Sequence, residues 1–106
     1  MWKISVNIIS LWRESIYQTL ESLVTQQVDF DIEINIILQW TLDQSKIAKL
    51  SESVTINIYN YEKWLWFGYY RNQAIEKSHG EILAWIDDDE RTKNDLWLEK
   101  ITRPII

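Results

Sequence analysis

Residues 81–89 read Glu-Ile-Leu-Ala-Trp-Ile-Asp-Asp-Asp, a short apolar run that leads directly into three consecutive aspartates. The run from Glu81 to Ile86 is typical of a buried β-strand. Carboxylates at the end of a buried strand repel one another, and the repulsion is costly unless a cation offsets it. Oxygen ligands of this kind suit Mg²⁺ or Mn²⁺, which complete their coordination with waters and phosphate oxygens. The segment therefore predicts a metal-binding cluster of Asp87, Asp88 and Asp89; the alternative is an acidic, solvated loop that caps the next helix.

The chain on both sides of this segment alternates between strand and helix patterns. β-Branched and apolar runs predict further strands at Lys3 to Ile9, Phe30 to Leu38 and Val54 to Tyr59. Apolar residues at helical spacing predict helices at Glu14 to Gln26, Gln44 to Leu50 and Phe67 to His79, and a last short helix after the aspartates. The expected buried faces are Ile16, Leu20, Leu23 and Val24 in the first helix, Phe67, Tyr70, Ala74 and Ile75 in the third, and Trp97, Leu98 and Ile101 in the last.

The alternation of strands and helices indicates βαβ units, which build a parallel sheet with right-handed crossovers. We expect an α/β fold of three layers, α/β/α, around a mostly parallel sheet of about four strands. At 106 residues we expect the chain to form one domain, residues 1–106. Gly80 stands where a left-handed residue often ends a helix. Ligands of such sheets bind at the carboxyl ends of the strands, where the aspartates are predicted to lie.

The composition excludes several classes of function. The net charge is −5 and the sequence pI is about 4.8, so no broad basic surface is available for a nucleic-acid backbone. The chain has no cysteine, which removes disulfides, thiolate metal sites and thiol nucleophiles and fits a reducing compartment. The start of the sequence lacks a secretory signal, and no apolar run reaches the length of a transmembrane segment. We therefore expect a cytoplasmic protein.

Three segments resemble family 2 glycosyltransferases. Gly80-Glu-Ile-Leu-Ala-Trp-Ile-Asp-Asp-Asp-Glu90, with Asp95-Leu-Trp-Leu-Glu-Lys-Ile101, is similar to the part of that family that carries its Asp-x-Asp motif. Gly68-Tyr-Tyr-Arg-Asn-Gln-Ala-Ile75 is similar to the family's Gly-x-x-Arg-Asn helix start. Lys3 to Ser10, followed by Leu20-Glu-Ser-Leu23, resembles its opening strand and first helix. The likeness covers essentially the whole chain.

The resemblance implies a fold of the GT-A type, the nucleotide-sugar-binding half of an inverting glycosyltransferase. A divalent metal, Mn²⁺ or Mg²⁺, would then be held by Asp87 and Asp89 against the diphosphate of a UDP- or GDP-linked sugar. Asp88 would lie nearest the sugar, and Arg71 would orient an aspartate or meet a phosphate. The metal's role would be to neutralise the charge that develops on the diphosphate leaving group.

Two strand ends depart from the family pattern. Ser10-Leu-Trp-Arg13 replaces the family's Pro-Thr-Tyr-Asn-like turn, and Gln39 stands where a carboxylate would read the nucleobase. Trp12 and Trp40 follow these strands and are candidates to stack on a base, with packing as the alternative. The remaining tryptophans, Trp85 among them, are expected to supply apolar area.

The sequence also stops before the stretch in which the family places its acceptor site and general base. The sole histidine, His79, is expected to have a solvated or capping role, so the catalytic residue is unknown and enzymatic activity of the isolated chain is undecided. A missing acceptor domain or a homo-oligomer would cover the aromatic residues at 64–70. One alternative function is a non-catalytic interaction module that keeps the fold and has lost donor binding. Another is a receiver-like phosphoacceptor domain, which fits poorly because the first strand ends without acidic residues.

Overall fold

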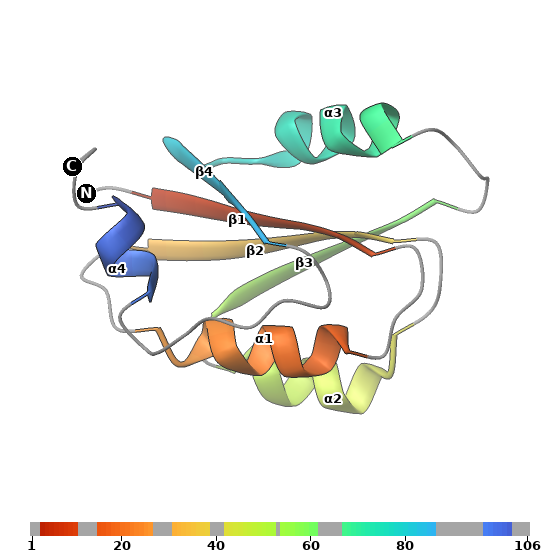
Figure 1. Cartoon of the computed structure of the whole chain (residues 1–106). Helices are drawn as coiled ribbons and strands as arrows, with labels where there is room; N and C mark the ends of the chain where they lie inside the picture. The colour runs from red at the N-terminus through yellow and green to blue at the C-terminus, as the bar shows by residue number, and fades with distance from the viewer. Residues whose placement is uncertain are drawn as a thin grey trace.

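The computed structural model describes residues 3–10, 15–26, 31–38, 42–52, 54–61, 67–86 and 97–102. Strands and helices alternate along these residues, as the sequence predicts (Figure 1). The elements are β1 (Lys3–Ser10), α1 (Ile16–Val24), β2 (Asp31–Leu38), α2 (Gln44–Leu50), β3 (Thr55–Asn60), α3 (Phe67–Lys77), β4 (Ile82–Trp85) and α4 (Trp97–Thr102). Predicted and observed bounds differ by only a few residues at the element ends, where helices and strands commonly fray.

The four strands form one parallel sheet in the order β3-β2-β1-β4. The first three strands are added in one direction, and β4 then returns to the other side of β1. The chain therefore reverses its direction of winding between β1 and β4. Ser10 pairs with Leu38 and Leu38 pairs with Asn60, so the carboxyl ends of three strands are level. This topology confirms the expected α/β class.

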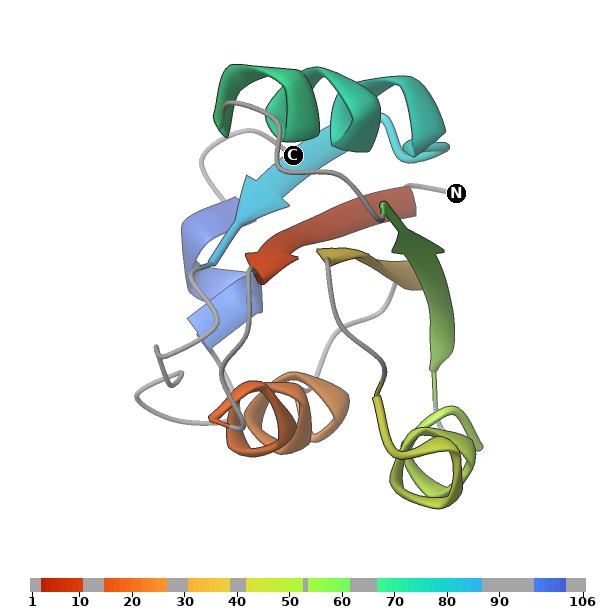
Figure 2. The ribbon, with the colours of Figure 1, turned by 90° about the vertical axis from the view of Figure 1, so that its right-hand side faces the viewer.

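The helices cover the sheet on two sides (Figure 2). On one side lie α1, α2 and α4, and here the larger core forms, because alternate strand residues and the apolar stripe of α1 meet. Ile4, Val6, Ile34 and Ile36 are fully buried in it, as are Ile16, Leu20 and Leu98. The N–H of Leu98 also donates to Oε1 of Gln26 at 2.7 Å, which joins α4 to the end of α1.

On the other side α3 packs over a smaller core. Tyr70 and Ala74 are buried against Ile37, and Tyr59 and Trp85 pack around them. Ile75, predicted to face inward, is 47% exposed. The prediction is wrong because Tyr70 and Ala74, four residues apart, already form the stripe that meets the sheet, and Ile75 lies about 100° further around the helix. The side chain of Phe67 lies outside the described residues.

A similar correction applies to α4. Leu98 is buried and Trp97 packs against the core, as expected, but Ile101 is 42% exposed. The buried partner of Leu98 is instead Thr102, whose hydroxyl donates to the carbonyl of Leu98 at 2.8 Å. The hydroxyl is satisfied within the helix, and this allows a polar residue to take the inward position.

Gly80 is required for a reason other than the one the sequence suggested. No described glycine has a positive φ, so the predicted left-handed helix end is wrong. A Cβ on Gly80 would lie 2.5 Å from the backbone nitrogen of Ser5 and 2.7 Å from its Oγ. Glycine is needed here because the chain between α3 and β4 passes against the backbone of β1.

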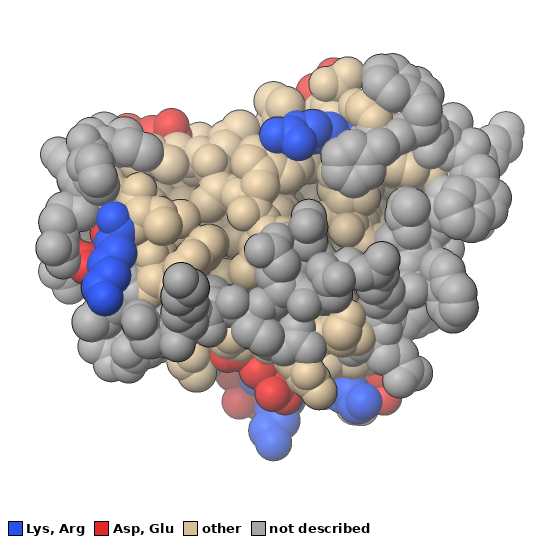
Figure 3. Space-filling model, in the orientation of Figure 1, with Lys and Arg blue, Asp and Glu red and all other residues tan. Residues whose placement is uncertain are grey.

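The β4 edge of the sheet faces the viewer in Figure 3, and its centre carries few charged side chains. β4 consists of apolar residues alone, and Leu83 is 36% exposed. Such an edge lacks the lysines, prolines and bulges that commonly protect edge strands from pairing with other chains. No helix in the described part of the chain is long and apolar enough to cross a membrane.

Candidate functional site

The carboxyl ends of the strands gather at one edge of the sheet, because all four strands run in the same direction. Ser10 and Leu38 are buried where β1 and β2 end. The N–H of Tyr61 donates to the carbonyl of Leu38 at 2.9 Å and extends the pairing of β3 with β2 by one residue. In open α/β sheets ligands bind outside these ends, at the point where the winding reverses. In this sheet that point is the boundary between the neighbouring strands β1 and β4.

In the sequence the acidic triplet comes directly after the β4 segment, whose carboxyl end lies at this edge. Ile86 is 6% exposed, and its N–H donates to the carbonyl of Asn7 at 3.3 Å, so the chain is anchored to β1 up to this residue. The next three residues in the sequence are Asp87, Asp88 and Asp89, which lie outside the described residues, as do three other predicted site residues, Gln39, Trp12 and Trp40. In the sequence all six stand within four residues of the ends of β1, β2 and β4.

Arg71 is the predicted site residue whose place is described. It lies in α3, exposed, and its guanidinium carbon is 4.6 Å from the centre of the Trp85 ring. An exposed cation over an indole contributes about 0.5–1 kcal/mol. Trp85 is the last residue of β4, so this contact holds the arginine beside the strand that leads into the aspartates. This contact of Trp85 could not be predicted from the sequence, because a contact between a helix and the following strand leaves no local spacing signal.

Polar side chains are buried under the connection between α3 and β4, toward the amino half of the sheet. Glu33 of β2 is 1% exposed. One of its carboxylate oxygens, Oε2, accepts from Oγ of Ser5 at 2.5 Å and from the N–H of His79 at 2.6 Å. The other, Oε1, is 3.1 Å from Nδ1 of His79, whose side chain is 68% exposed. Burial favours the neutral acid, but the hydrogen bonds from Ser5 and His79 outweigh it and lower the pKa of Glu33 to about 2.

A row of asparagines crosses the sheet next to this carboxylate. Nδ2 of Asn57 donates to Oδ1 of Asn35 at 3.0 Å, and Nδ2 of Asn35 donates to Oδ1 of Asn7 at 3.1 Å. Nδ2 of Asn7 donates to Oγ of Ser78 at 3.0 Å. In the described part of the chain every buried side-chain nitrogen and oxygen has a partner. The alternation of Glu33 and Asn35 with isoleucines resembles a solvent-facing strand, so sequence reasoning gave no sign that these groups are buried.

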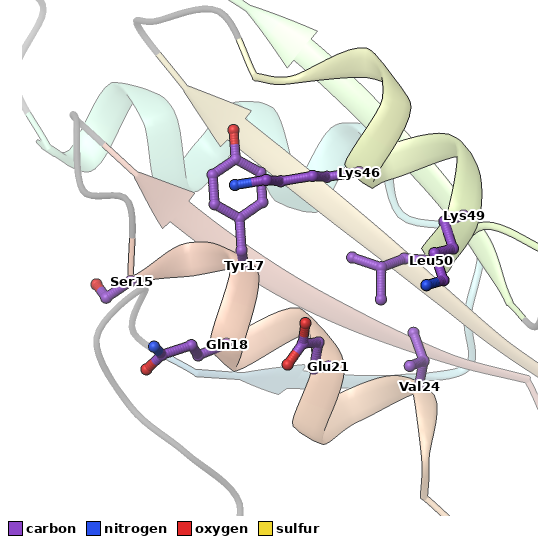
Figure 4. Close-up of a pocket in the computed structure, with 8 residues that line it drawn as sticks. All are labelled: Ser15, Tyr17, Gln18, Glu21, Val24, Lys46, Lys49 and Leu50. Atoms are coloured by element: carbon purple, nitrogen blue, oxygen red, sulfur yellow. The ribbon is translucent and has the colours of Figure 1, made fainter.

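A separate groove lies between α1 and α2 on the opposite side of the sheet (Figure 4). Its volume is about 850 Å³. Nζ of Lys46 is 4.6 Å from the centre of the Tyr17 ring, and the hydroxyl of Tyr17 accepts from the N–H of Asp43 at 2.8 Å. Its lining residues belong to the two helices and to Ser15 just before α1, and the groove is therefore distinct from the site at β1 and β4.

The arrangement defines a class of fold. A parallel sheet in the order β3-β2-β1-β4, with the reversal between β1 and β4, corresponds to the 3-2-1-4 part of a doubly wound α/β sheet. A receiver-like domain has instead the order 2-1-3-4-5. The phosphoacceptor alternative is therefore excluded by strand order.

Solved structures share this fold. TarS of S. aureus, a GT-A-type glycosyltransferase, matches over 97% of this chain with a TM-score of 0.78 and 24% identity, and the match covers 19% of TarS. A 1–349 form of TarS in complex with UDP-GlcNAc matches equally well, with 31% of its length covered. The mannosyltransferase PcManGT from Pyrobaculum calidifontis, in complex with GDP-Man and Mn²⁺, matches over 86% of the chain with a TM-score of 0.66 and 16% identity, and 29% of its length is covered. The GT-A type of fold that the resemblance implied is confirmed.

The chain spans about a fifth to a third of the length of these solved structures of TarS and PcManGT. No protein-family model matches the sequence, and no curated protein matches it.

Proposed function

We propose that this chain is the nucleotide-sugar-binding part of a glycosyltransferase and binds a UDP- or GDP-linked sugar through a divalent cation. The observation that supports the proposal is the sequence position of the acidic triplet, which comes directly after Ile86, while β4 lies next to β1 where the winding reverses. Solved structures with the same fold contain UDP-GlcNAc in one case and GDP-Man with Mn²⁺ in another. Both ligands are diphosphates, and a cation or a cationic side chain would offset their negative charge.

The donor set fits Mn²⁺ or Mg²⁺. Carboxylates supply oxygen ligands, and the chain has no cysteine whose thiolate would favour a softer metal. In the proposed site Asp87 and Asp89 hold the metal, and Asp88 lies nearest the sugar. Arg71, held by Trp85, contributes a second positive charge toward the diphosphate. When bound, the metal would stabilise the charge on the departing diphosphate.

Residues after the neighbouring strands complete the proposed site on the nucleoside side. Gln39 offers an amide in place of the usual carboxylate, and Trp12 and Trp40 offer aromatic faces for a base. The acceptor site and the general base for glycosyl transfer would come from further chain or from a partner, and residues 1–106 would form a single unit that binds the donor. A general base contributes roughly 10²- to 10⁴-fold to a rate, so we expect little transfer activity from this unit alone.

Calorimetric titration with UDP and then GDP, with and without Mn²⁺, tests the proposal. The key variant is Asp87→Asn with Asp89→Asn. A matched control is Asp31→Asn with Glu52→Gln, which removes the same charge from exposed positions away from the site. We expect metal-dependent binding that is lost in the first double variant and kept in the second. Absence of binding under every condition would refute the proposal and favour an interaction module that keeps the fold.

A further inference from the structure

The two elements that carry the proposed metal and phosphate ligands are joined by one short connection. α3 carries Arg71, β4 leads into the acidic triplet, and residues 78–81 link the helix to the strand. The position of this connection therefore determines where β4 begins to pair with β1. Any shift at this point is transmitted along a strand of only four residues.

Each residue of the connection is held by the sheet below it. The hydroxyl of Ser78 accepts from Nδ2 of Asn7 at 3.0 Å and donates to the carbonyl of Ala74 at 2.7 Å. His79 donates its N–H to Glu33, and Gly80 donates its own to Oγ of Ser5 at 2.8 Å. The N–H of Glu81 then donates to the carbonyl of Lys3 at 2.8 Å, the first bond between the β4 segment and β1.

Glu33 links these contacts. Its carboxylate binds the backbone of the connection directly through His79, and it binds Ser5, which in turn accepts from Gly80. A glutamine has the same shape, but its amide offers one acceptor oxygen and an N–H₂ group that faces donors. With that oxygen in the place of Oε2, the glutamine keeps the bonds from Ser5 and from the His79 N–H only in their weaker, uncharged form. Its N–H₂ group then faces Nδ2 of Asn57, which donates to Oε1 of Glu33 at 3.4 Å. Removing the charge should therefore weaken the hold of this side chain on the connection.

β4 has few other supports at its amino end. It pairs with β1 alone among the described strands, over four register positions from Ile82 to Trp85. Gly80 also lies so close to Ser5 that no side chain at position 80 could add a supporting contact. If the connection moves, β4 has no second neighbour in the described sheet to restore its place.

We propose that Glu33 is a positioning residue for the metal and diphosphate site: its carboxylate clamps the connection between α3 and β4, and so fixes the relative places of Arg71 and the acidic triplet. The inference rests on the proposed function, since it assigns a residue that acts on that site from the opposite half of the sheet. Glu33 itself touches neither metal nor nucleotide.

The test compares Glu33→Gln with a control of similar instability, Leu23→Ala. Leu23 is 1% exposed and belongs to the larger core, on the other side of the sheet from α3. UDP affinity in the presence of Mn²⁺ is measured by calorimetry at a temperature where both variants are fully folded. Amide hydrogen exchange is measured at Leu83 and Ile86. Ser5→Ala is a milder second variant, because it removes the hydroxyl between Glu33 and Gly80 and keeps the carboxylate.

We expect Glu33→Gln to weaken UDP binding by roughly tenfold, as loss of an orienting group near a metal site does, and to speed exchange at Leu83 and Ile86. Ser5→Ala should change both in the same direction, and Leu23→Ala should change neither. Affinity of Glu33→Gln equal to that of Leu23→Ala, or unchanged exchange in β4, would overturn the positioning role while leaving donor binding intact. Failure of the wild-type chain to bind UDP with Mn²⁺ would instead refute the proposed function, and with it the site that Glu33 positions.

Discussion

The buried carboxylate of Glu33 should make the stability of the chain depend steeply on acid. Burial alone would raise the pKa of Glu33. The hydrogen bonds from Ser5 and His79 favour the ionised form more strongly and lower the pKa from 4.5 to about 2. A group with a depressed pKa stabilises the folded state above its unfolded pKa and loses that contribution as the pH falls through its folded pKa. At about 1.4 kcal/mol per unit, the full contribution is about 3 kcal/mol. It should disappear between about pH 4.5 and pH 2.

Urea unfolding followed by tryptophan fluorescence, in a series from pH 7 to pH 2.5, measures this contribution. The perturbation is Glu33→Gln, and the quantity is the difference in free energy of unfolding between wild type and variant at each pH. We expect a large and constant difference above about pH 5, and a fall of about 2–3 kcal/mol by pH 2.5. Glu52→Gln, at an exposed position, serves as the control and should not reproduce this fall. A difference between wild type and Glu33→Gln that does not change with pH would refute the reasoning.

Three further predictions concern single contacts. Gly80→Ala should lower the free energy of unfolding, measured in urea, by about 1–3 kcal/mol. Adding Ser5→Ala should not restore stability, because the shortest contact of the new Cβ is with the backbone nitrogen of Ser5. A neutral effect of Gly80→Ala would contradict this packing. Leu83→Lys should reduce any self-association seen by sedimentation, because a charge on an edge strand opposes pairing, and undiminished association would show that the β4 edge is not the contact. Arg71→Gln should lower the free energy of unfolding by about 0.5–1 kcal/mol, because the contact with Trp85 is lost. The same variant should weaken UDP binding with Mn²⁺ by roughly tenfold. Unchanged affinity would show that Arg71 is not part of the site.

The order and type of the elements follow from the sequence because periodicity reports them directly. The short helix Gln44–Leu50 has the predicted bounds, and its N-cap Asp43 accepts from the N–H of Ser45 at 3.0 Å, a local interaction. The apolar stripe of α1 is buried where the spacing placed it. Strand order was not predicted beyond a parallel sheet, because it depends on crossovers between distant segments.

The errors fall where distant contacts override local patterns. Ile75 and Ile101 lie on faces that the helices leave exposed, and Thr102 is buried in α4 where the spacing had predicted Ile101. Gly80 was predicted to end a helix in the left-handed conformation. A glycine is needed there instead because the position lies against Ser5 of β1, 75 residues earlier in the chain. Likewise the burial of Glu33 depends on a connection 46 residues later. The acidic triplet, Gln39, Trp12 and Trp40 stay predictions, since they lie outside the described residues.

Paramagnetic broadening by Mn²⁺ in the presence of UDP tests the central claim most directly, because it locates the metal on the sheet. Amide signals are compared between the carboxyl ends of the strands, at Ser10, Leu38 and Ile86, and the opposite edge, at Ile4 and Ile32. We predict strong broadening at the first group and little at the second, with the effect lost in Asp87→Asn with Asp89→Asn. Broadening centred on the opposite edge, or no selective broadening at all, would contradict a metal and diphosphate site at the end of β4.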